Sequence, residues 1–304
     1  MAYTRLSDAN EITARYMDSI LIQERLIGSV VADTKTVLFG TEFDTPVLTP
    51  AFSHLGCYQG RPQNGLEEYS LAAKQCNMLN FCGMMENEQF RRIADTGAKT
   101  VRIVKPYADN GKVRDQFAFA EEAGAFGIGM DIDHIFGEGG LDIVAGEPMA
   151  VQTKDMLRSY VESTKLPFIV KGILSIEDAL TCAEIGAKGI IVSHHHGRLP
   201  YAVPPMMILP KIREALEGKD VTIMLDCGIE SGADVYKALA LGVDAVAVGR
   251  SMLPDLEKDG TEGVVRFIGK VTGELRYIMS CTGFAKVADI DDSALVGLGI
   301  GDGS

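Results

Sequence analysis

The sequence predicts a single (β/α)8 barrel, the TIM-barrel fold, with a short N-terminal helical cap. From about residue 46 onward, short apolar runs alternate with longer amphipathic segments. Continuous apolar runs such as IIVS and AVAVG are typical of parallel strands that are buried on both faces. Eight such runs, each followed by a helical segment, give the element count of this barrel.

The elements follow one another evenly along the chain. Strands are expected at residues 46–51, 78–82, 100–105, 126–131, 167–171, 189–193, 221–226 and 245–249. Helices are expected at residues 66–76, 87–95, 112–123, 151–163, 176–185, 206–216, 233–240 and 264–279. The segments SIEDALTCAEIGAKGIIVS and GADVYKALALGVDAVAVGR repeat one helix–turn–strand unit. This repetition favours the barrel over an open doubly wound sheet or two smaller α/β domains.

Three regions are expected in the chain. Residues 1–45 form the cap, in which residues 17–45 are expected to be a helix and then an extended piece over the barrel floor. Residues 46–290 form the barrel, since no Pro/Ser-rich linker divides them. Residues 291–304 are rich in glycine and are expected to be a flexible tail.

The composition narrows the possible partners and the compartment. With 29 Lys+Arg against 42 Asp+Glu, the net charge is −13, which argues against binding to nucleic acid or to anionic membranes. The first 17 residues lack the apolar core of a secretory signal. No run approaches the roughly 20 apolar residues of a membrane span. Six singly spaced cysteines indicate reduced thiols, so a cytoplasmic protein is expected.

Polar residues stand at nearly every predicted strand end, where (β/α)8 enzymes carry their sites. The last two strands end in LDCGI and VGRSM, each before a helix. Glycines at such turns let backbone amides approach an anion, so Gly228, Gly249 and Arg250 predict a phosphate site.

The segment 193–198 reads Ser-His-His-His-Gly-Arg. Successive side chains on an extended strand point to opposite sides, so these histidines are not expected to share a metal ion. A general base beside Arg198 is favoured, because imidazole titrates near neutral pH and arginine binds a carboxylate bidentately. Packed histidines without a function remain an alternative. Lys171 closes an apolar strand, where it is expected to act as a Schiff-base nucleophile or as a fixed cation, unless it only reaches solvent at the rim.

The segments LPFIVKGILSIEDA, GIIVSHHHGR and IMLDCGIESGADVYKALALGVDAVAVGRSML together resemble the FMN-dependent α-hydroxy acid oxidase and dehydrogenase family. The resemblance covers most of the chain and is most specific over residues 166–254. It implies a flavoenzyme that oxidises a 2-hydroxy acid to a 2-oxo acid.

The resemblance also implies a role for each matched residue. His195 would be the base, Asp133 would orient it, and Arg198 would hold the substrate carboxylate. Lys171 would stabilise the reduced flavin. The remaining FMN contacts would come from Pro50, Ala51, Phe52, Cys82, Arg102, Asp131, Ser193, Asp226, Gly228, Gly249 and Arg250.

Several positions depart from the family pattern. The resemblance aligns the glutamine and tyrosine of the third strand with Arg102 and Val104, the threonine of the fourth with Asp131, and the serine of the second with Cys82. The family's N-terminal tyrosine and its second carboxylate-binding arginine have no counterpart, and Glu230 replaces a further arginine. The substrate is therefore expected not to be simple lactate or glycolate. We further expect Arg102 and Asp131 to form an ion pair that shifts the flavin potential.

Other interpretations share parts of these motifs. An FMN-dependent isomerase resembling type 2 isopentenyl diphosphate isomerase, or IMP dehydrogenase, would use a similar half-barrel. A flavin-free aldolase would use Lys171 as a Schiff base, and a barrel that has lost its chemistry would serve as a binding subunit. A small carboxylate-bearing substrate and a homo-oligomer, such as a tetramer, are the expected partners.

Overall fold

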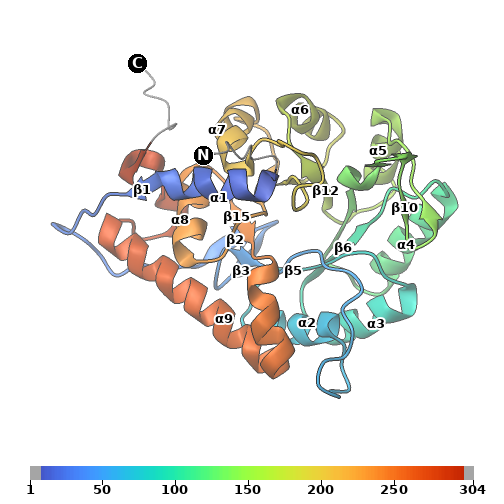
Figure 1. The fold of residues 1–304 in the computed structure, drawn as a ribbon, viewed down its shortest axis with the longest axis horizontal. Coiled ribbons are helices and arrows are strands. Elements are labelled where there is room, and N and C mark those ends of the chain that lie inside the picture. Colours follow the sequence, from blue (N-terminus) through green and yellow to red (C-terminus); the bar gives the residue numbers. More distant parts are fainter. Residues whose placement is uncertain (1–7, 298–304) are drawn as a thin grey trace, which may run out of the picture.

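A computed structural model describes residues 8–297 and confirms the barrel (Figure 1). Eight parallel strands lie in the order β4-β15-β14-β13-β12-β7-β6-β5. The Thr49 N–H donates to the Leu79 carbonyl (3.4 Å), and the Phe81 N–H donates to Thr49 Oγ1 (2.7 Å), so β4 meets β5 and the sheet closes. The strands are β4 (Val47–Leu48), β5 (Asn80–Cys82), β6 (Thr100–Val104), β7 (Gly127–Asp131), β12 (Phe168–Ile173), β13 (Gly189–Val192), β14 (Thr222–Leu225) and β15 (Ala245–Ala247).

A helix follows each strand, as the sequence predicts. The helices are α2 (Gly65–Gln75), α3 (Asn87–Asp95), α4 (Asn110–Glu122), α5 (Lys154–Val161), α6 (Ile176–Glu184), α7 (Pro205–Ala215), α8 (Gly232–Ala240) and α9 (Leu253–Thr282). Side-chain caps begin several of them; Ser231 and Asp234, for example, form a capping box at α8. Helix α9 begins well before the expected residue 264 and is kinked at Gly260.

Successive side chains of each strand point alternately into the barrel and out toward the helices. Leu48, Phe81, Ile103, Ile169 and Met224 belong to one buried cluster that fills the interior. The residues between them on the same strands pack outward in a second cluster with the helices. A side chain can therefore reach the mouth of the barrel only if it is in register with the interior set.

The N-terminal segment covers both ends of the barrel. Helix α1 (Ala9–Ser19) begins earlier than expected and lies at the carboxyl ends of the strands, where Thr13 Oγ1 is 2.9 Å from His194 Nε2. The hairpin of β2 (Thr36–Leu38) and β3 (Thr41–Phe43) covers the floor, with Phe43 edge-on to Phe126 at 6.0 Å.

The expected C-terminal tail is in part regular structure. Residues 291–297 contain the 3-10 turn η4 (Asp292–Ala294) and strand β16 (Leu295–Gly297), which pairs antiparallel with β1 (Ile20–Ile22). The rest of the expected tail, residues 298–304, lies outside the described residues. Over residues 8–297, no helix combines the length and the apolarity needed to cross a bilayer.

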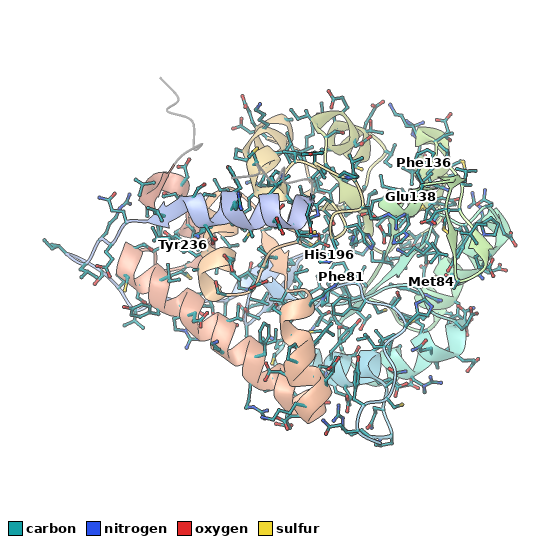
Figure 2. The ribbon with its side chains drawn as sticks, in the orientation of Figure 1. Phe81, Met84, Phe136, Glu138, His196 and Tyr236 are labelled. Atoms are coloured by element: carbon teal, nitrogen blue, oxygen red, sulfur yellow. The ribbon has the colours of Figure 1, made fainter. Side chains whose placement is uncertain are left out.

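The segment after β7 folds over the mouth of the barrel. It begins with the 3-10 turn η1 (Ile132–His134) and continues as two small hairpins, β8 (Phe136–Gly137) with β9 (Gly140–Leu141) and β10 (Ile143–Val144) with β11 (Glu147–Pro148). We call residues 134–148 the β7 flap. Figure 2 shows Phe136 and Glu138 of this flap on the α5 side of the molecule. Two further 3-10 turns are η2 (Arg250–Met252) and η3 (Val287–Asp289).

Candidate active site

Charged side chains are buried together at the carboxyl ends of β6, β7 and β12. Lys105, Asp131 and Lys171 are 6%, 3% and 5% exposed. The Lys171 ammonium lies 3.8 Å from Asp131, 3.4 Å from Asp133 and 3.6 Å from Asp226. Burial opposes its charge, but these carboxylates raise the pKa of Lys171 well above its usual range. Lys171 is therefore a fixed cation, as one of the two interpretations expected.

Gly172 allows Asp133 to approach this lysine. Its φ is +97°, and a Cβ there would lie 2.7 Å from Asp133 Cβ. The register of β12 against β13 also shifts between Lys171 and Ile173. Glycine alone adopts this left-handed backbone without strain, and it has no Cβ to collide with Asp133. Gly172, directly after Lys171, therefore lets the aspartate lie over the end of the strand.

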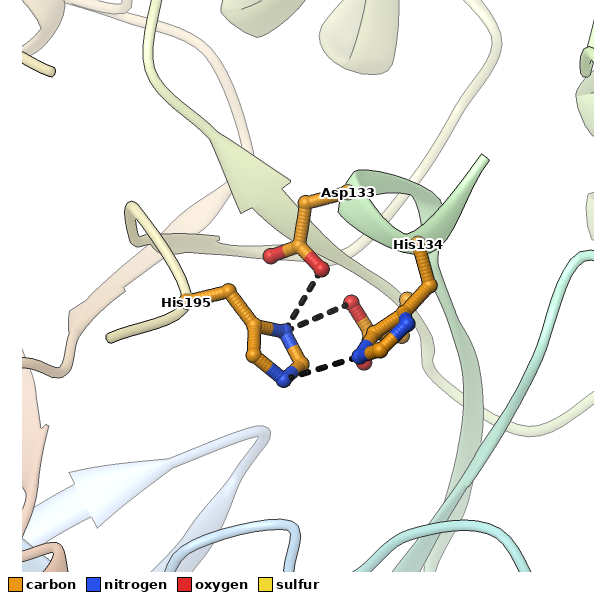
Figure 3. Close-up of side chains that lie close together, drawn as sticks. Asp133, His134 and His195 are labelled. Carbon is orange, nitrogen blue, oxygen red and sulfur yellow. Dashed lines mark hydrogen bonds and ion pairs between the residues drawn. The ribbon is translucent and has the colours of Figure 1, made fainter. Parts of the chain in front are cut away.

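His195 stands at the centre of the site (Figure 3). Its Nδ1 is 2.6 Å from Asp133 Oδ1, 3.2 Å from Lys171 Nζ and 3.5 Å from Asp131 Oδ1. Burial and Lys171 disfavour protonation, but the two carboxylates prevail and raise the pKa of His195 above 6.5. Burial raises the pKa of Asp133 to about 6, against the opposing effect of Lys171. His195 and Asp133, for which the resemblance implies the roles of base and orienting group, are thus in direct contact.

A second histidine caps the base, and the sequence analysis gave it no role. His134 Nε2 lies 3.1 Å from His195 Nε2, and His134 Nδ1 lies 3.4 Å from Asp142 Oδ2. Burial and Lys105 lower the pKa of His134 to about 3, so its ring is neutral. Its Nδ1–H then donates to Asp142, and its Nε2 accepts from the Nε2–H of His195. The only available signal was that His134 directly follows Asp133.

Arg198 lies beside this pair, but it is already engaged. Its Nη2 donates to Asp142 Oδ2 (2.6 Å) and to the Phe136 carbonyl (2.7 Å), both in the β7 flap. Its Nη1 lies 3.5 Å from His134 Nε2. The predicted carboxylate holder therefore already has a carboxylate from the protein.

The expected ion pair between Arg102 and Asp131 is wrong. Arg102 points out of the barrel and donates to Asn87 Oδ1 (2.8 Å), to the Met85 carbonyl (2.9 Å) and to the Gln116 carbonyl (3.3 Å). Lys105 holds Asp131 instead, at 2.5 Å. Because side chains alternate along a strand, Arg102 faces the helices while its neighbours Val101 and Ile103 face the barrel interior. The inward positions of β6 are Ile103 and Lys105.

The Cys82 side chain also points away from the mouth. It packs in the outer cluster, its Sγ contacts the Val101 carbonyl at 3.8 Å, and burial raises its pKa to about 12. At both Cys82 and Arg102, a contact with a ligand in the mouth is left to the backbone.

The other predicted cofactor residues surround the mouth. Ser193 Oγ lies 3.4 Å from Lys171 Nζ, and the Phe52 carbonyl accepts from the Gly83 N–H (2.7 Å), so the chain after β4 lies against the end of β5. The two glycines differ in the space around them. A Cβ at Gly228 would lie 2.7 Å from Met17 Sδ, whereas a Cβ at Gly249 would have no atom of the described residues within 4 Å, apart from its two chain neighbours. Arg250 contacts the ring of His196. Pro50 and Ala51 precede Phe52 on the same loop.

Four side chains offer ligand atoms within 4.8 Å of one another, namely Asp131, Asp133, His134 and His195. A divalent ion there would compete with Lys105 and Lys171, which already contact the two carboxylates. Lys105, Lys171 and Arg198 each also face at least one aspartate.

Residues 142–297, about half of the chain, match the family model described as FMN-dependent dehydrogenase. The chain belongs to this family. It is 42% identical over 131 residues to an L-lactate dehydrogenase of Acinetobacter baylyi, a match that covers 43% of this chain and 34% of that protein. The match thus spans about a third of that curated relative's length.

Solved structures match a larger share of this chain than the sequence relative does. A mandelate oxidase variant with a monooxide FMN adduct superposes with a TM-score of 0.84 at 27% identity, covering 97% of this chain and 93% of that one. An arginine-to-leucine variant of mandelate oxidase with 2-hydroxy-phenylacetamide superposes with a TM-score of 0.82 at 26% identity, covering 92% and 88%. The whole barrel, including the segment before residue 142, therefore has the fold of these enzymes.

Proposed function

We propose that this protein is an FMN-dependent oxidoreductase that oxidises a 2-hydroxy compound to its 2-oxo product. The observation that carries the proposal is the contact of His195 Nδ1 with Asp133, beside the buried cation Lys171. A base held by a carboxylate, next to a fixed positive charge, is suited to removing a proton while negative charge develops nearby.

The residues at the mouth fit FMN. Asp131 Oδ1 is buried and accepts no hydrogen bond from the described residues, and the isoalloxazine ring of FMN carries a donor at N3. Gly249 leaves open space beside Arg250, where a phosphate would meet a cation. The part of FMN between its ring and its phosphate would be lined by Ser193, Asp226 and Gly228. When bound, FMN would supply the acceptor for two electrons.

Each protein group then has a defined task. His195 takes the substrate hydroxyl proton on Nε2, after its own proton has left that atom. Asp133 holds the ring through Nδ1 and stabilises the imidazolium that forms. Lys171 keeps its charge throughout, because three carboxylates surround it.

The alternatives are less well supported. A Schiff-base lysine must lose its proton to attack a carbonyl, whereas the surroundings of Lys171 raise its pKa well above 10.5. The isomerase alternative is not favoured, since the relatives named above are hydroxy acid dehydrogenases and oxidases.

We propose a cytoplasmic homo-oligomer for the whole protein, with neither nucleic acid nor membrane as partner. Six free cysteines support a reducing compartment. The net charge of −13 supports the exclusion of polyanionic partners. Gel filtration with light scattering tests the oligomer.

The decisive experiment is on the purified full-length protein. We expect a yellow protein that releases FMN on denaturation and whose flavin is bleached by a 2-hydroxy substrate without oxygen. His195→Ala should stay yellow and lose at least about 100-fold in the rate of bleaching, because the base does not anchor the cofactor. A colourless protein that takes up no FMN would contradict the proposal. An active His195→Ala variant would contradict the assigned role.

A further inference from the structure

The β7 flap supplies Arg198 with a carboxylate from the protein itself. Asp142 Oδ2 lies 2.6 Å from Arg198 Nη2, and the two side chains are 20% and 27% exposed. The Phe136 carbonyl accepts the second bond from the same nitrogen, at 2.7 Å. The flap therefore uses both N–H groups of Nη2.

Those two N–H groups are the ones that a substrate carboxylate needs. A guanidinium binds a carboxylate bidentately either through Nη1 and Nη2 or through Nε and Nη2. Both arrangements include Nη2, so neither is open while Asp142 and Phe136 are in place. A carboxylate arriving beside Asp142 would also meet a like charge.

Nothing else in the cluster compensates for this loss. Lys171 lies among three carboxylates, and Lys105 pairs with Asp131 at 2.5 Å. His134 lines the space between Arg198 and His195 as a neutral ring. Lys105, Lys171 and Arg198 are thus each paired with a carboxylate of the described residues, and Arg250 is the cation proposed for the phosphate.

We infer that Asp142 is a specificity-determining residue that directs the site to 2-hydroxy compounds with an uncharged group, such as an amide or an ester, in place of the carboxylate. The inference rests on the proposed function and names its substrate class. The chemistry is unchanged, because the hydroxyl proton, the hydrogen on the carbinol carbon and the two electrons leave the same two atoms in acid and amide. Only recognition of the neighbouring group differs.

The test measures binding, with ligands that cannot be oxidised. Phenylacetate and phenylacetamide have the same skeleton and differ in charge, and both lack the hydroxyl group. Their dissociation constants for the FMN-loaded full-length protein are measured by calorimetry and by the change in flavin absorbance. Asp142→Asn removes the competing charge, and Asp142→Ser provides a second variant should the first fold poorly. Glu138→Gln is the matched control, because it removes one negative charge from the exposed turn of the same flap.

In the wild type, the amide should bind more tightly than the acid. Asp142→Asn should tighten phenylacetate by about tenfold or more, whereas Glu138→Gln should change it by less than about twofold. Tighter binding of phenylacetate than of phenylacetamide by the wild type overturns the inference, because Arg198 is then available. Equal effects of the two variants, or no binding of either ligand, also overturn it. Failure of the proposed function is distinguishable, because the protein would then carry no flavin.

Discussion

Lys105 offers the clearest quantitative test of how the site is built. Its ammonium lies 2.5 Å from Asp131, and the two side chains are 7% and 4% exposed. Replacing it with methionine keeps a similar volume but leaves the buried carboxylate with Lys171 at 3.8 Å as its remaining ammonium partner.

The expected loss follows from the burial of the pair. Breaking a buried ion pair by removing one partner costs about 3–5 kcal/mol. Because Lys171 still faces Asp131, the lower end applies, and Lys105→Met should reduce the free energy of unfolding by about 3 kcal/mol. Replacing both partners in Lys105→Met/Asp131→Met should restore most of this loss, since no buried carboxylate is then left uncompensated.

The loss should depend on pH in a defined direction. Although burial acts the other way, Lys171 and Lys105 hold the pKa of Asp131 well below its usual range. This pair therefore stabilises the protein above the unfolded-state pKa of about 4, and its contribution is lost as the pH falls below that value. The cost of Lys105→Met should be constant at neutral pH and should shrink in acid.

The assay is urea unfolding followed by far-UV circular dichroism, because the chain has no tryptophan. Lys35→Met is the control, since Lys35 and Glu42 form an ion pair at 2.8 Å with side chains 50% and 60% exposed. That substitution should cost less than about 1 kcal/mol. If Lys105→Met costs no more than Lys35→Met, the buried pair does not stabilise the fold and the reasoning fails.

Three further predictions concern the same site. The kcat/KM for a 2-hydroxy substrate should rise with pH through the pKa of His195, which Asp131 and Asp133 hold above 6.5 against the effect of burial. Asp133→Asn should move this rise to lower pH, and an unchanged pH profile would show that Asp133 does not act on His195. Arg102→Met should lower the free energy of unfolding by about 2 kcal/mol, through its lost hydrogen bonds, and leave the flavin midpoint potential unchanged; a shifted potential would return Arg102 to the site. Gly172→Ala should lower the Tm, because alanine at a φ of +97° costs more than about 1 kcal/mol and its Cβ would meet Asp133; an unchanged Tm would refute the close approach.

Much of the fold could be predicted because its signals are local. Residues 189–192 and 245–247 are continuous apolar runs, and both are strands of the barrel. Helix α3 occupies the expected range, because its apolar Phe90 and Ile93 recur at helical spacing and are buried. The short hairpins of the β7 flap were not predicted, since strands of two residues carry no periodic signal.

The site residues likewise divide into those that could be predicted from the sequence and those that could not. Motif matching found His195, Asp133 and Lys171, because each directly follows or closes a recognisable strand. It misplaced Arg102, because a shift of one residue is invisible in an apolar run yet reverses the side chain's direction. Lys105 ends the predicted strand 100–105 but was given no role in the site, and neither was His134, which directly follows Asp133.

The sequence by itself determined the order of the strands and helices, the barrel class, and which strand ends carry chemistry, because these depend on periodicity and neighbouring residues. Only the tertiary structure decided how the charges pair. Asp142 lies 56 residues before Arg198 in the chain, and Thr13 lies 181 residues before His194. Contacts between such distant residues are set by how the loops close over the barrel, and the free energy of an ion pair depends on burial and on distances of a few ångströms. The sequence therefore indicated a site for a carboxylate, whereas the folded chain supplies that carboxylate itself.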